Sequence, residues 1–183
     1  MTTGDMTRLP LIDEAAAGGA VGETLGELAA RGPLGPMVRT MAKSSALLRG
    51  YLDLSRAMKR SHLDRRISER ISLAVQEWLG CDYCIAAHSE AARALGLSET
   101  DIELARQGTA TDAKIAAIVA FGQQVAAAPA EITDEQVEEL RSLGYRDDQI
   151  ADVVGLVALN VLTGAFNLVA GIHPVTTATR SAA

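Results

Sequence analysis

The sequence predicts an all-helical protein with a single main domain, from its composition, its periodicity and its glycines. Hydrophobic residues make up 48% of the 183 residues but aromatic residues only 3%, so the apolar content is mostly Ala, Leu, Val and Ile. Ala and Leu are strong helix formers, and small aliphatic side chains let helices approach closely. Apolar residues recur at three- and four-residue steps between glycines, and no segment has a convincing strand pattern.

The first half of the chain is expected to contain an N-terminal extension and four helices. The extension, residues 1–34, holds one or two short helices interrupted by glycines. Ser44 is placed to cap a helix of the main domain, and Gly80 and Gly96 are placed to end one each. The helices expected here span residues 37–44, 44–61, 63–80 and 81–96.

The second half continues with four more helices, so the main domain is expected to cover residues 35–174. Ser98 with Asp101 resembles a capping box, and Pro129 stops a helix because proline cannot continue one. The tail, residues 175–183, is expected to be disordered. The helices expected in this half span residues 97–108, 111–129, 133–144 and 146–172.

The last of these helices contains an uncharged stretch, residues 153–172, that is just long enough to span a membrane. The stretch holds Asn160, Thr163 and Asn167 as well as three glycines, and no basic flank or aromatic belt follows it. A central helix buried on all sides by the rest of the protein is therefore expected, with no membrane association.

The charge pattern limits the kinds of partner expected for this protein, and the N-terminus indicates its compartment. The chain carries a net charge of -6, and its one short basic run is KRSHLDRR, residues 59–66, expected to be a solvated loop and helix start. Nucleic acid is not an expected partner, because its phosphates require a basic surface. The N-terminus lacks the basic and apolar regions of a secretory signal, so a cytoplasmic location is expected, where structural disulfides are rare.

The stretch EWLGCDYCIAAHSEAAR contains both cysteines of the chain and its only Trp. On a helix that starts near Cys81, the side chains of Cys81, Cys84 and His88 form one stripe. Cys81 lies in the first turn, where free amide groups and the helix dipole favour a thiolate. The thiolate is the reactive form of cysteine, so the stripe is a candidate redox centre.

A turn at Gly80 folds the preceding helix back along this one and brings its carboxylates toward the stripe. With a rise of about 1.5 Å per residue, Glu69 reaches the level of His88. Glu77, one turn before the glycine, is expected nearer to Cys81. A carboxylate beside an imidazole beside a thiol forms a proton relay that activates the thiol. The catalytic candidates are Glu69, Cys81, Cys84 and His88.

Other interpretations of the two cysteines are weaker. A structural zinc site needs four ligands and the stripe supplies three, while His62 and His173 lie at unrelated spacings, so no metal is expected. A haem attachment requires a His directly after the second Cys, where Ile85 stands, so no haem is expected. A pair of inert, half-buried core thiols is the remaining alternative.

The segment ERISLAVQEWLGCDYCIAAH closely resembles the signature of the AhpD-like alkylhydroperoxidase family, within the carboxymuconolactone decarboxylase superfamily. The shared pattern is a Glu, eleven residues and then Cys-x-x-Cys-x-x-x-His. Length, helix order and the run LNVLTGAFN extend the resemblance over about residues 35–172. It implies an all-α, AhpD-like helical bundle in which the CxxC helix follows a Gly-ended helix. The residues that match the pattern are Glu69, Cys81, Cys84 and His88.

The resemblance implies a thiol-dependent peroxidase that reduces organic hydroperoxides or hydrogen peroxide through a dithiol/disulfide cycle without a cofactor. It also implies that Cys84 attacks the peroxide and Cys81 resolves, while Glu69 and His88 relay protons. The helix-start argument instead favours Cys81 as the more acidic thiol, so the order of the two cysteines stays open. The alternatives are a non-peroxidatic dithiol redox partner or sensor and a decarboxylase of the same superfamily.

Self-association is the last expectation from the sequence. A chain so rich in Ala, Leu and Val exposes apolar helix faces unless it assembles with further copies. The run LVALNVLTGAFNLVAG, residues 156–171, is the candidate interface or core, and the resemblance implies a dimer, trimer or hexamer. The expected partners are a hydroperoxide, a dithiol protein or small thiol as reductant, and other copies of this chain.

Overall fold

A computed structural model describes residues 7–13 and 17–174; the tail 175–183, expected to be disordered, lies outside the described residues. The described residues form nine α-helices, one short 3-10 turn (Pro129–Glu131) and no strand, which confirms the predicted all-helical class. The helices are α1 (Gly19–Ala29), α2 (Pro36–Met41), α3 (Ser45–Met58), α4 (Arg65–Leu79), α5 (Asp82–Ala94), α6 (Glu99–Arg106), α7 (Ala113–Ala127), α8 (Asp134–Ser142) and α9 (Asp147–Ala170).

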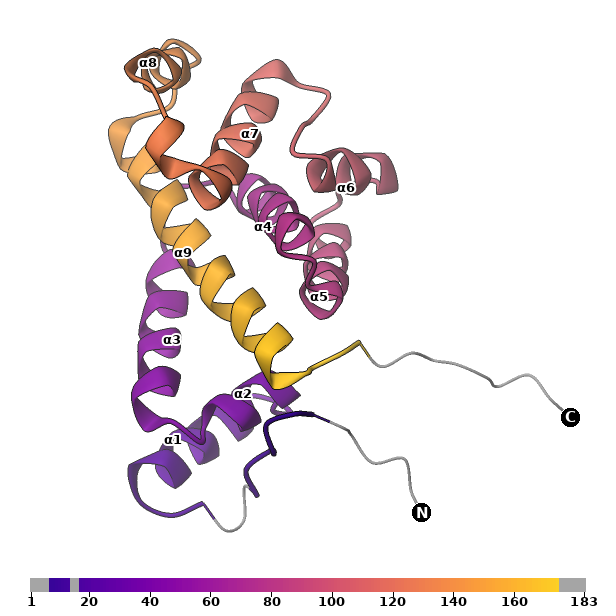
Figure 1. Ribbon diagram of the computed structural model, residues 1–183, viewed down its shortest axis with the longest axis vertical. Coiled ribbons are helices and arrows are strands. Elements are labelled where there is room, and N and C mark those ends of the chain that lie inside the picture. The colour runs from indigo at the N-terminus through magenta and orange to yellow at the C-terminus, as the bar shows by residue number, and fades with distance from the viewer. Residues whose placement is uncertain (1–6, 14–16, 175–183) are drawn as a thin grey trace, which may run out of the picture.

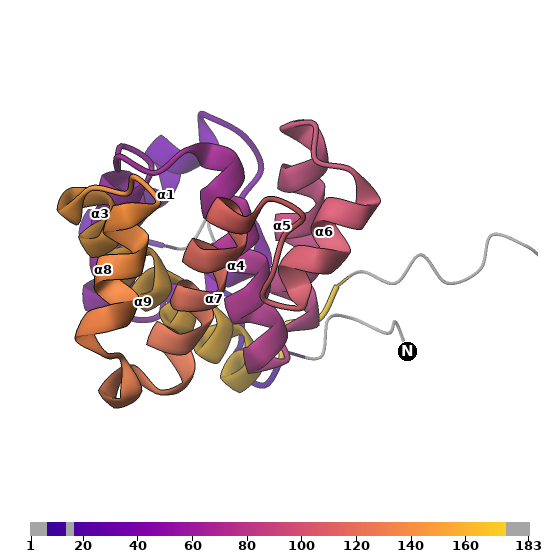
Figure 2. The ribbon, with the colours of Figure 1, turned by 90° about the horizontal axis from the view of Figure 1, so that it is seen from above.

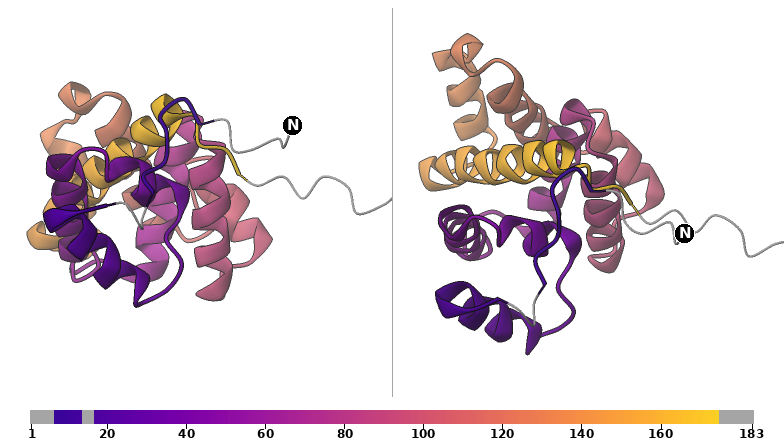
Figure 3. Two further views of the ribbon diagram at one scale, coloured as in Figure 1. Left: turned by 90° about the horizontal axis from the view of Figure 1, so that it is seen from below. Right: turned by 60° about the horizontal axis from the view of Figure 1, so that its bottom comes forward.

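Helices α4 and α9 form the centre of the molecule. α4 packs against α5, α6, α7 and α9, and α9 also contacts α3 and α7. In Figure 1, α9 runs diagonally between α1 to α3 on one side and α4 to α7 on the other. Seen from above, α4 lies between α9 and the α5–α6 pair (Figure 2), and Figure 3 shows α3 between α1 and α9.

The main core lies where α4, α7 and α9 meet. Ile71 and Val75 of α4, Ile118 and Val119 of α7 and Val153 of α9 are completely buried there. Burying a side chain of this size contributes about 1.5–3 kcal/mol, so this junction is the rigid base on which the neighbouring helices are held.

Helix ends follow the predicted caps closely. Ser44 and Ser98 cap α3 and α6, and the predicted capping box is present at Ser98. The cap of one helix differs from the prediction: the helix expected to start at Thr111 begins at Ala113. Asp112 is the reason, because its side chain caps α7 by accepting a hydrogen bond from the backbone N–H of Ile115 at 3.0 Å.

The prediction that the last helix is buried on all sides is wrong. Of the described helices, α9 alone is long and apolar enough to span a membrane, and 39% of its most apolar 18-residue window is buried. One face of α9 packs on α3, α4 and α7, whereas Val154 and Val169 are 50% and 63% exposed. The neighbouring helices reach only one side of α9, and this leaves an apolar face open.

The described part of the N-terminal extension wraps around the end of α9. The backbone N–H of Arg8 donates to the carbonyl of Ala170 at 2.6 Å. Helix α1 follows, and its Leu25 is buried in a small separate core with Leu48 of α3. The boundary expected near residue 34 stays a prediction.

Candidate active site

Two residues, Gly80 and Cys81, connect α4 to α5, and the glycine turns the chain back on itself. Gly80 has φ 72°, a left-handed conformation that favours glycine, and the backbone N–H of Cys81 donates to the carbonyl of Gln76 at 3.1 Å. The two helices therefore pack side by side. This packing brings His88 Nδ1 within 2.7 Å of Glu69 Oε2, the pairing that the spacing predicted.

The Glu69–His88 pair is largely shielded from solvent. The side chain of Glu69 is 11% exposed and that of His88 is 28% exposed. A hydrogen bond from one ring nitrogen to a carboxylate orients the imidazole and leaves the other nitrogen free to exchange a proton. Arg65, one helical turn before Glu69, adds a longer ion pair, with 3.9 Å between its guanidinium nitrogen and Glu69 Oε1.

The two cysteines occupy the first turn of α5. Cys81 is the N-cap residue, and its Sγ accepts a hydrogen bond from the backbone N–H of Cys84 at 3.4 Å. The two sulfurs form a disulfide across a Cα separation of 5.3 Å, within the range that disulfides adopt. Cys81 is 1% exposed and Cys84 is 5% exposed. The CxxC pair is thus held in one buried turn beside the acid–imidazole pair.

Asn167 of α9 provides a contact to Cys84 from the opposite wall of the site. Its Nδ2 donates a hydrogen bond to Cys84 Sγ at 3.2 Å, across 83 positions of the sequence. Asn167 is 1% exposed, and its Oδ1 has no hydrogen-bond partner among the described residues. A buried amide donor beside a sulfur favours the negative charge of a thiolate.

A second polar contact fixes α9 against α4 close to this asparagine. Gln76 Nε2 donates to Asn160 Oδ1 at 2.9 Å, and Asn160 Nδ2 donates to Ser72 Oγ at 3.0 Å. The helices approach closely here because position 164 is glycine: a Cβ on Gly164 would lie 2.5 Å from Gln76 Oε1. These hydrogen bonds fix how closely α9 packs against α4 and thereby place Asn167 beside Cys84 Sγ.

A cavity of about 340 Å³ opens beside Cys84 among α3, α4, α5 and α9. Glu69, His88, Asn167 and Cys84 all line it, whereas Cys81 does not. A ligand in the cavity therefore reaches the Cys84 sulfur and is separated from the Cys81 sulfur.

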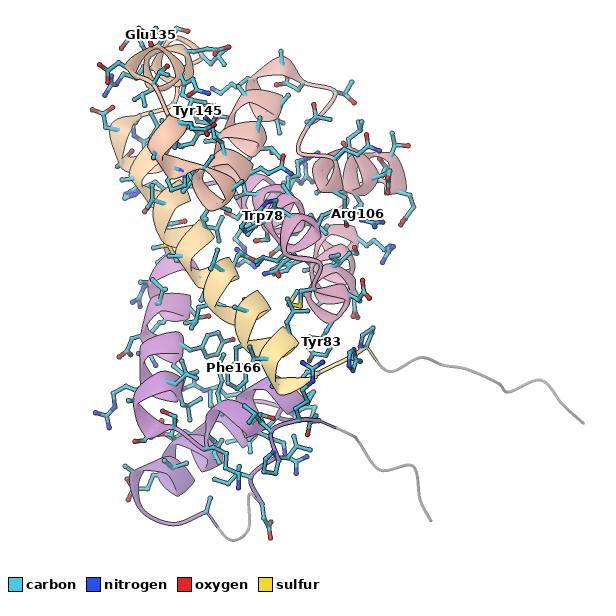
Figure 4. The ribbon with its side chains drawn as sticks, viewed as in Figure 1. Trp78, Tyr83, Arg106, Glu135, Tyr145 and Phe166 are labelled. Atoms are coloured by element: carbon cyan, nitrogen blue, oxygen red, sulfur yellow. A yellow bond between two sulfur atoms is a disulfide. The ribbon has the colours of Figure 1, made fainter. Side chains whose placement is uncertain are left out.

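Two tyrosines also contribute polar groups to the cavity wall. Burial raises the pKa of Tyr51 and the pKa of Tyr83 above the ordinary phenol value. Both phenols keep their protons at neutral pH and serve as hydrogen-bond donors. Figure 4 shows Tyr83 at the start of α5, close to the disulfide.

The remaining polar candidates lie outside the cavity. Glu77, expected near Cys81, pairs with Arg106 of α6 at 2.8 Å on the outer side of α4. His62 lies in the loop before α4, with its Nδ1 3.2 Å from Asp152 Oδ2, and His173 follows α9. Within residues 7–13 and 17–174, no group of three His, Cys, Asp or Glu side chains is arranged to hold a metal ion.

The sequence contained one signal for the part of the site that it did not predict. Asn160 and Asn167 interrupt an otherwise apolar stretch, and a buried amide requires a partner. No local pattern encodes how α9 and α3 cross α4 and α5. This crossing decides which group the buried amide bonds, where the cavity forms and that Tyr51 lies in its wall.

Comparison with known proteins supports the same fold. Residues 45–127 match the model of the carboxymuconolactone decarboxylase family. No curated protein sequence matches the chain. Among solved structures, the alkylhydroperoxidase AhpD core of a peroxidase-related protein from Ralstonia eutropha JMP134 superposes with a TM-score of 0.82 at 21% identity, covering 94% of each chain.

Two further structures show how widely this fold is used. A peroxidase-related protein from Silicibacter sp. TM1040 superposes with a TM-score of 0.79 at 21% identity, covering 96% of each chain. A cysteine-to-alanine variant of the debrominase Bmp8, in complex with 2,3,4-tribromopyrrole, superposes with a TM-score of 0.68 at 17% identity, covering 90% of each chain. The resemblance found in the sequence is confirmed as a similarity: residues 45–127 match the carboxymuconolactone decarboxylase family model, and the chain adopts an AhpD-like helical fold.

Proposed function

We propose that this protein is a thiol-dependent peroxidase that reduces organic hydroperoxides or hydrogen peroxide through a dithiol/disulfide cycle. One observation carries the proposal: Cys84, bonded to Cys81, faces a cavity that also contains the Glu69–His88 pair. A thiol, a base and a space for a substrate are the minimum that peroxide reduction by cysteine requires. The family match and the AhpD-like fold agree with redox chemistry at a CxxC pair.

The first step oxidises Cys84. With both cysteines reduced, His88, oriented by Glu69, accepts the proton of the Cys84 thiol, and Asn167 donates a hydrogen bond to the thiolate. The thiolate attacks the terminal oxygen of the hydroperoxide, so that an S–O bond forms while the O–O bond breaks. The departing alkoxide takes the proton from His88 and leaves as an alcohol. Cys84 is left as a sulfenic acid.

The second step closes the disulfide. The Cys81 sulfur attacks Cys84 Sγ, the S–S bond forms, the S–O bond breaks, and the hydroxide leaves as water with the Cys81 proton. A dithiol protein or a small thiol then reduces the disulfide by exchange, in the reducing cytoplasm where we place the protein. This order of the cysteines is supported by the cavity, which reaches Cys84 and not Cys81.

The direct test is turnover of cumene hydroperoxide with dihydrolipoamide as the reductant. We expect the wild-type protein to consume peroxide catalytically and the Cys84→Ser variant to be inactive. Glu77→Gln is the matched control, because this carboxylate of α4 pairs with Arg106 away from the cavity. Equal rates for the wild type and Cys84→Ser would refute the peroxidase. Disulfide exchange without turnover would favour a redox partner, and substrate-dependent CO2 release would favour a decarboxylase.

Trapping of the sulfenic acid tests the order of the two cysteines. In the Cys81→Ser variant, a peroxide pulse should leave a sulfenic acid on Cys84 that dimedone labels and mass spectrometry locates. A sulfenic acid on Cys81 in the Cys84→Ser variant, with none on Cys84 in Cys81→Ser, would reverse the assignment.

A further inference from the structure

The short basic run of residues 59–66 contributes to the wall of the cavity. Lys59 is the C-cap residue of α3 and Arg65 is the first residue of α4, so the two cations flank the connection between these helices. Both line the cavity that contains Cys84 and His88. The run is therefore more than the solvated loop that its composition predicts.

The side chains that line the cavity carry more positive than negative charge. Glu69 is the one acidic residue in the lining, and its carboxylate is already engaged by His88 at 2.7 Å and more loosely by Arg65 at 3.9 Å. Lys59 forms no ion pair with the carboxylates of the described part of the chain. The lining has two cations, Lys59 and Arg65, against the single carboxylate of Glu69, so in a protein with a net charge of -6 this cavity is a local site of attraction for anions.

The size and the remaining lining of the cavity favour a bulky organic molecule. A water molecule occupies about 30 Å³ in the liquid. Hydrogen peroxide has two oxygen atoms and takes roughly twice that volume, so it would fill roughly a fifth of the 340 Å³ cavity. Apolar side chains from three helices form much of the wall, as is typical of pockets for small organic ligands. They include Met58 of α3, Ala87 of α5, and Leu156 and Leu159 of α9.

We propose that the preferred substrate is an organic hydroperoxide whose apolar body carries a carboxylate. This inference rests on the proposed peroxidase function. The apolar body occupies the wall of Met58, Leu156 and Leu159, the hydroperoxy group meets Cys84, and the carboxylate pairs with Lys59 and Arg65. The carboxylate does not react: the O–O bond breaks, one oxygen passes to Cys84 and the product is the corresponding hydroxy acid.

The test compares two substrates that differ by one carboxylate group, cumene hydroperoxide and its para-carboxylate derivative, through the ratio of their kcat/KM values. We expect the wild type to favour the anionic substrate and Lys59→Gln to lower the ratio by roughly two- to fivefold, as for a solvent-accessible ion pair. Lys43→Gln is the matched control, since Lys43 is exposed in the turn after α2, outside the cavity lining, and should leave the ratio unchanged. The preference should also shrink from about 0.01 M to about 1 M salt, as the Debye length shortens from about 30 Å to about 3 Å.

The outcomes separate this inference from the proposed function. Turnover of both substrates with the same ratio in the wild type, Lys59→Gln and Lys43→Gln would overturn the substrate class and leave the peroxidase intact. If neither peroxide is turned over, the peroxidase itself fails, and calorimetric binding of 4-isopropylbenzoate tests the anion site alone. Weaker binding to Lys59→Gln than to Lys43→Gln would support that site, and equal binding would refute it.

Discussion

Glu69 and His88 are 19 positions apart, and their side chains meet at 2.7 Å across one tight turn. Their pairing followed from two regular helices joined at Gly80, because a helix has a fixed rise and its faces repeat every few residues. Asn167 is different: it reaches Cys84 from 83 positions away, on a helix that is not adjacent to α5 in the sequence. At the scale of single residues, proximity in sequence decided what could be predicted.

Glu69→Gln tests the proton relay with little change in shape. The amide still fills the same space but no longer supports a protonated His88, so we expect kcat/KM for peroxide to fall by a factor of about 10² or more, within the range of general acid–base catalysis. Steady-state kinetics with cumene hydroperoxide measure this, with Glu77→Gln as the control. Activity equal to the wild type would remove Glu69 from the mechanism.

Asn167→Asp tests the hydrogen bond to the sulfur. The change replaces the Nδ2 donor with a carboxylate oxygen, so in a Cys81→Ser background the Cys84 thiolate should form only at higher pH, as followed by its ultraviolet absorbance. Loss of a hydrogen bond to a charged group predicts a peroxide rate about ten- to a hundredfold lower. Gln107→Glu is the control for an added carboxylate, since Gln107 is exposed at the C-cap of α6, outside the cavity lining. If the Cys84 thiolate forms at the same pH in both variants, Asn167 packs against the sulfur without stabilising the thiolate.

At the scale of elements, α4 organises the site because it contacts α5, α6, α7 and α9 at once. Its C-cap residue Gly80 directs α5 back along α4, and its Gln76 fixes how closely α9 packs against it. Most helix ends were predictable, since caps and terminal glycines act within a few residues of the end that they set. The start of α7 was shifted by Asp112, a cap of the same kind placed one residue beyond Thr111.

Gly80→Ala isolates the contribution of the turn between α4 and α5. A Cβ at this position meets nothing within 4 Å, so the cost is the left-handed backbone alone, about 1–2 kcal/mol of the free energy of unfolding. Urea denaturation of the wild type, Gly80→Ala and Gly80→Asn should rank them in the order Gly, Asn, Ala, because Asn tolerates this conformation better than Ala. Stability of Gly80→Ala equal to the wild type would contradict this account of the turn.

At the scale of the whole molecule, the open face of α9 is the feature that a single chain leaves uncovered. Val154, Leu168 and Val169 are among the large hydrophobic side chains most exposed to solvent. Apolar side chains gathered on one helix face are typical of an assembly interface, which agrees with the homo-oligomer expected from composition.

The double variant Val154→Asp/Val169→Asp tests this assembly. We expect the wild type to sediment as a dimer, trimer or hexamer at micromolar concentration and the variant to sediment as a monomer with an unchanged helical circular dichroism spectrum. A wild-type monomer would refute self-association through α9. Association of that monomer with lipid vesicles, lost in the variant, would identify a membrane as the partner of this face instead.

The sequence by itself determined the helical class, most helix ends, the stripe of Cys81, Cys84 and His88, and its pairing with Glu69 across Gly80, because each depends on interactions within one helix or across one turn. The tertiary structure alone decided that Cys84 rather than Cys81 faces the cavity, that Asn167 donates to its sulfur and that Lys59 joins the wall. It also decided which face of α9 is buried. These features depend on how helices distant in sequence cross one another, and the depth and angle of a crossing are set by side chains on both partners together.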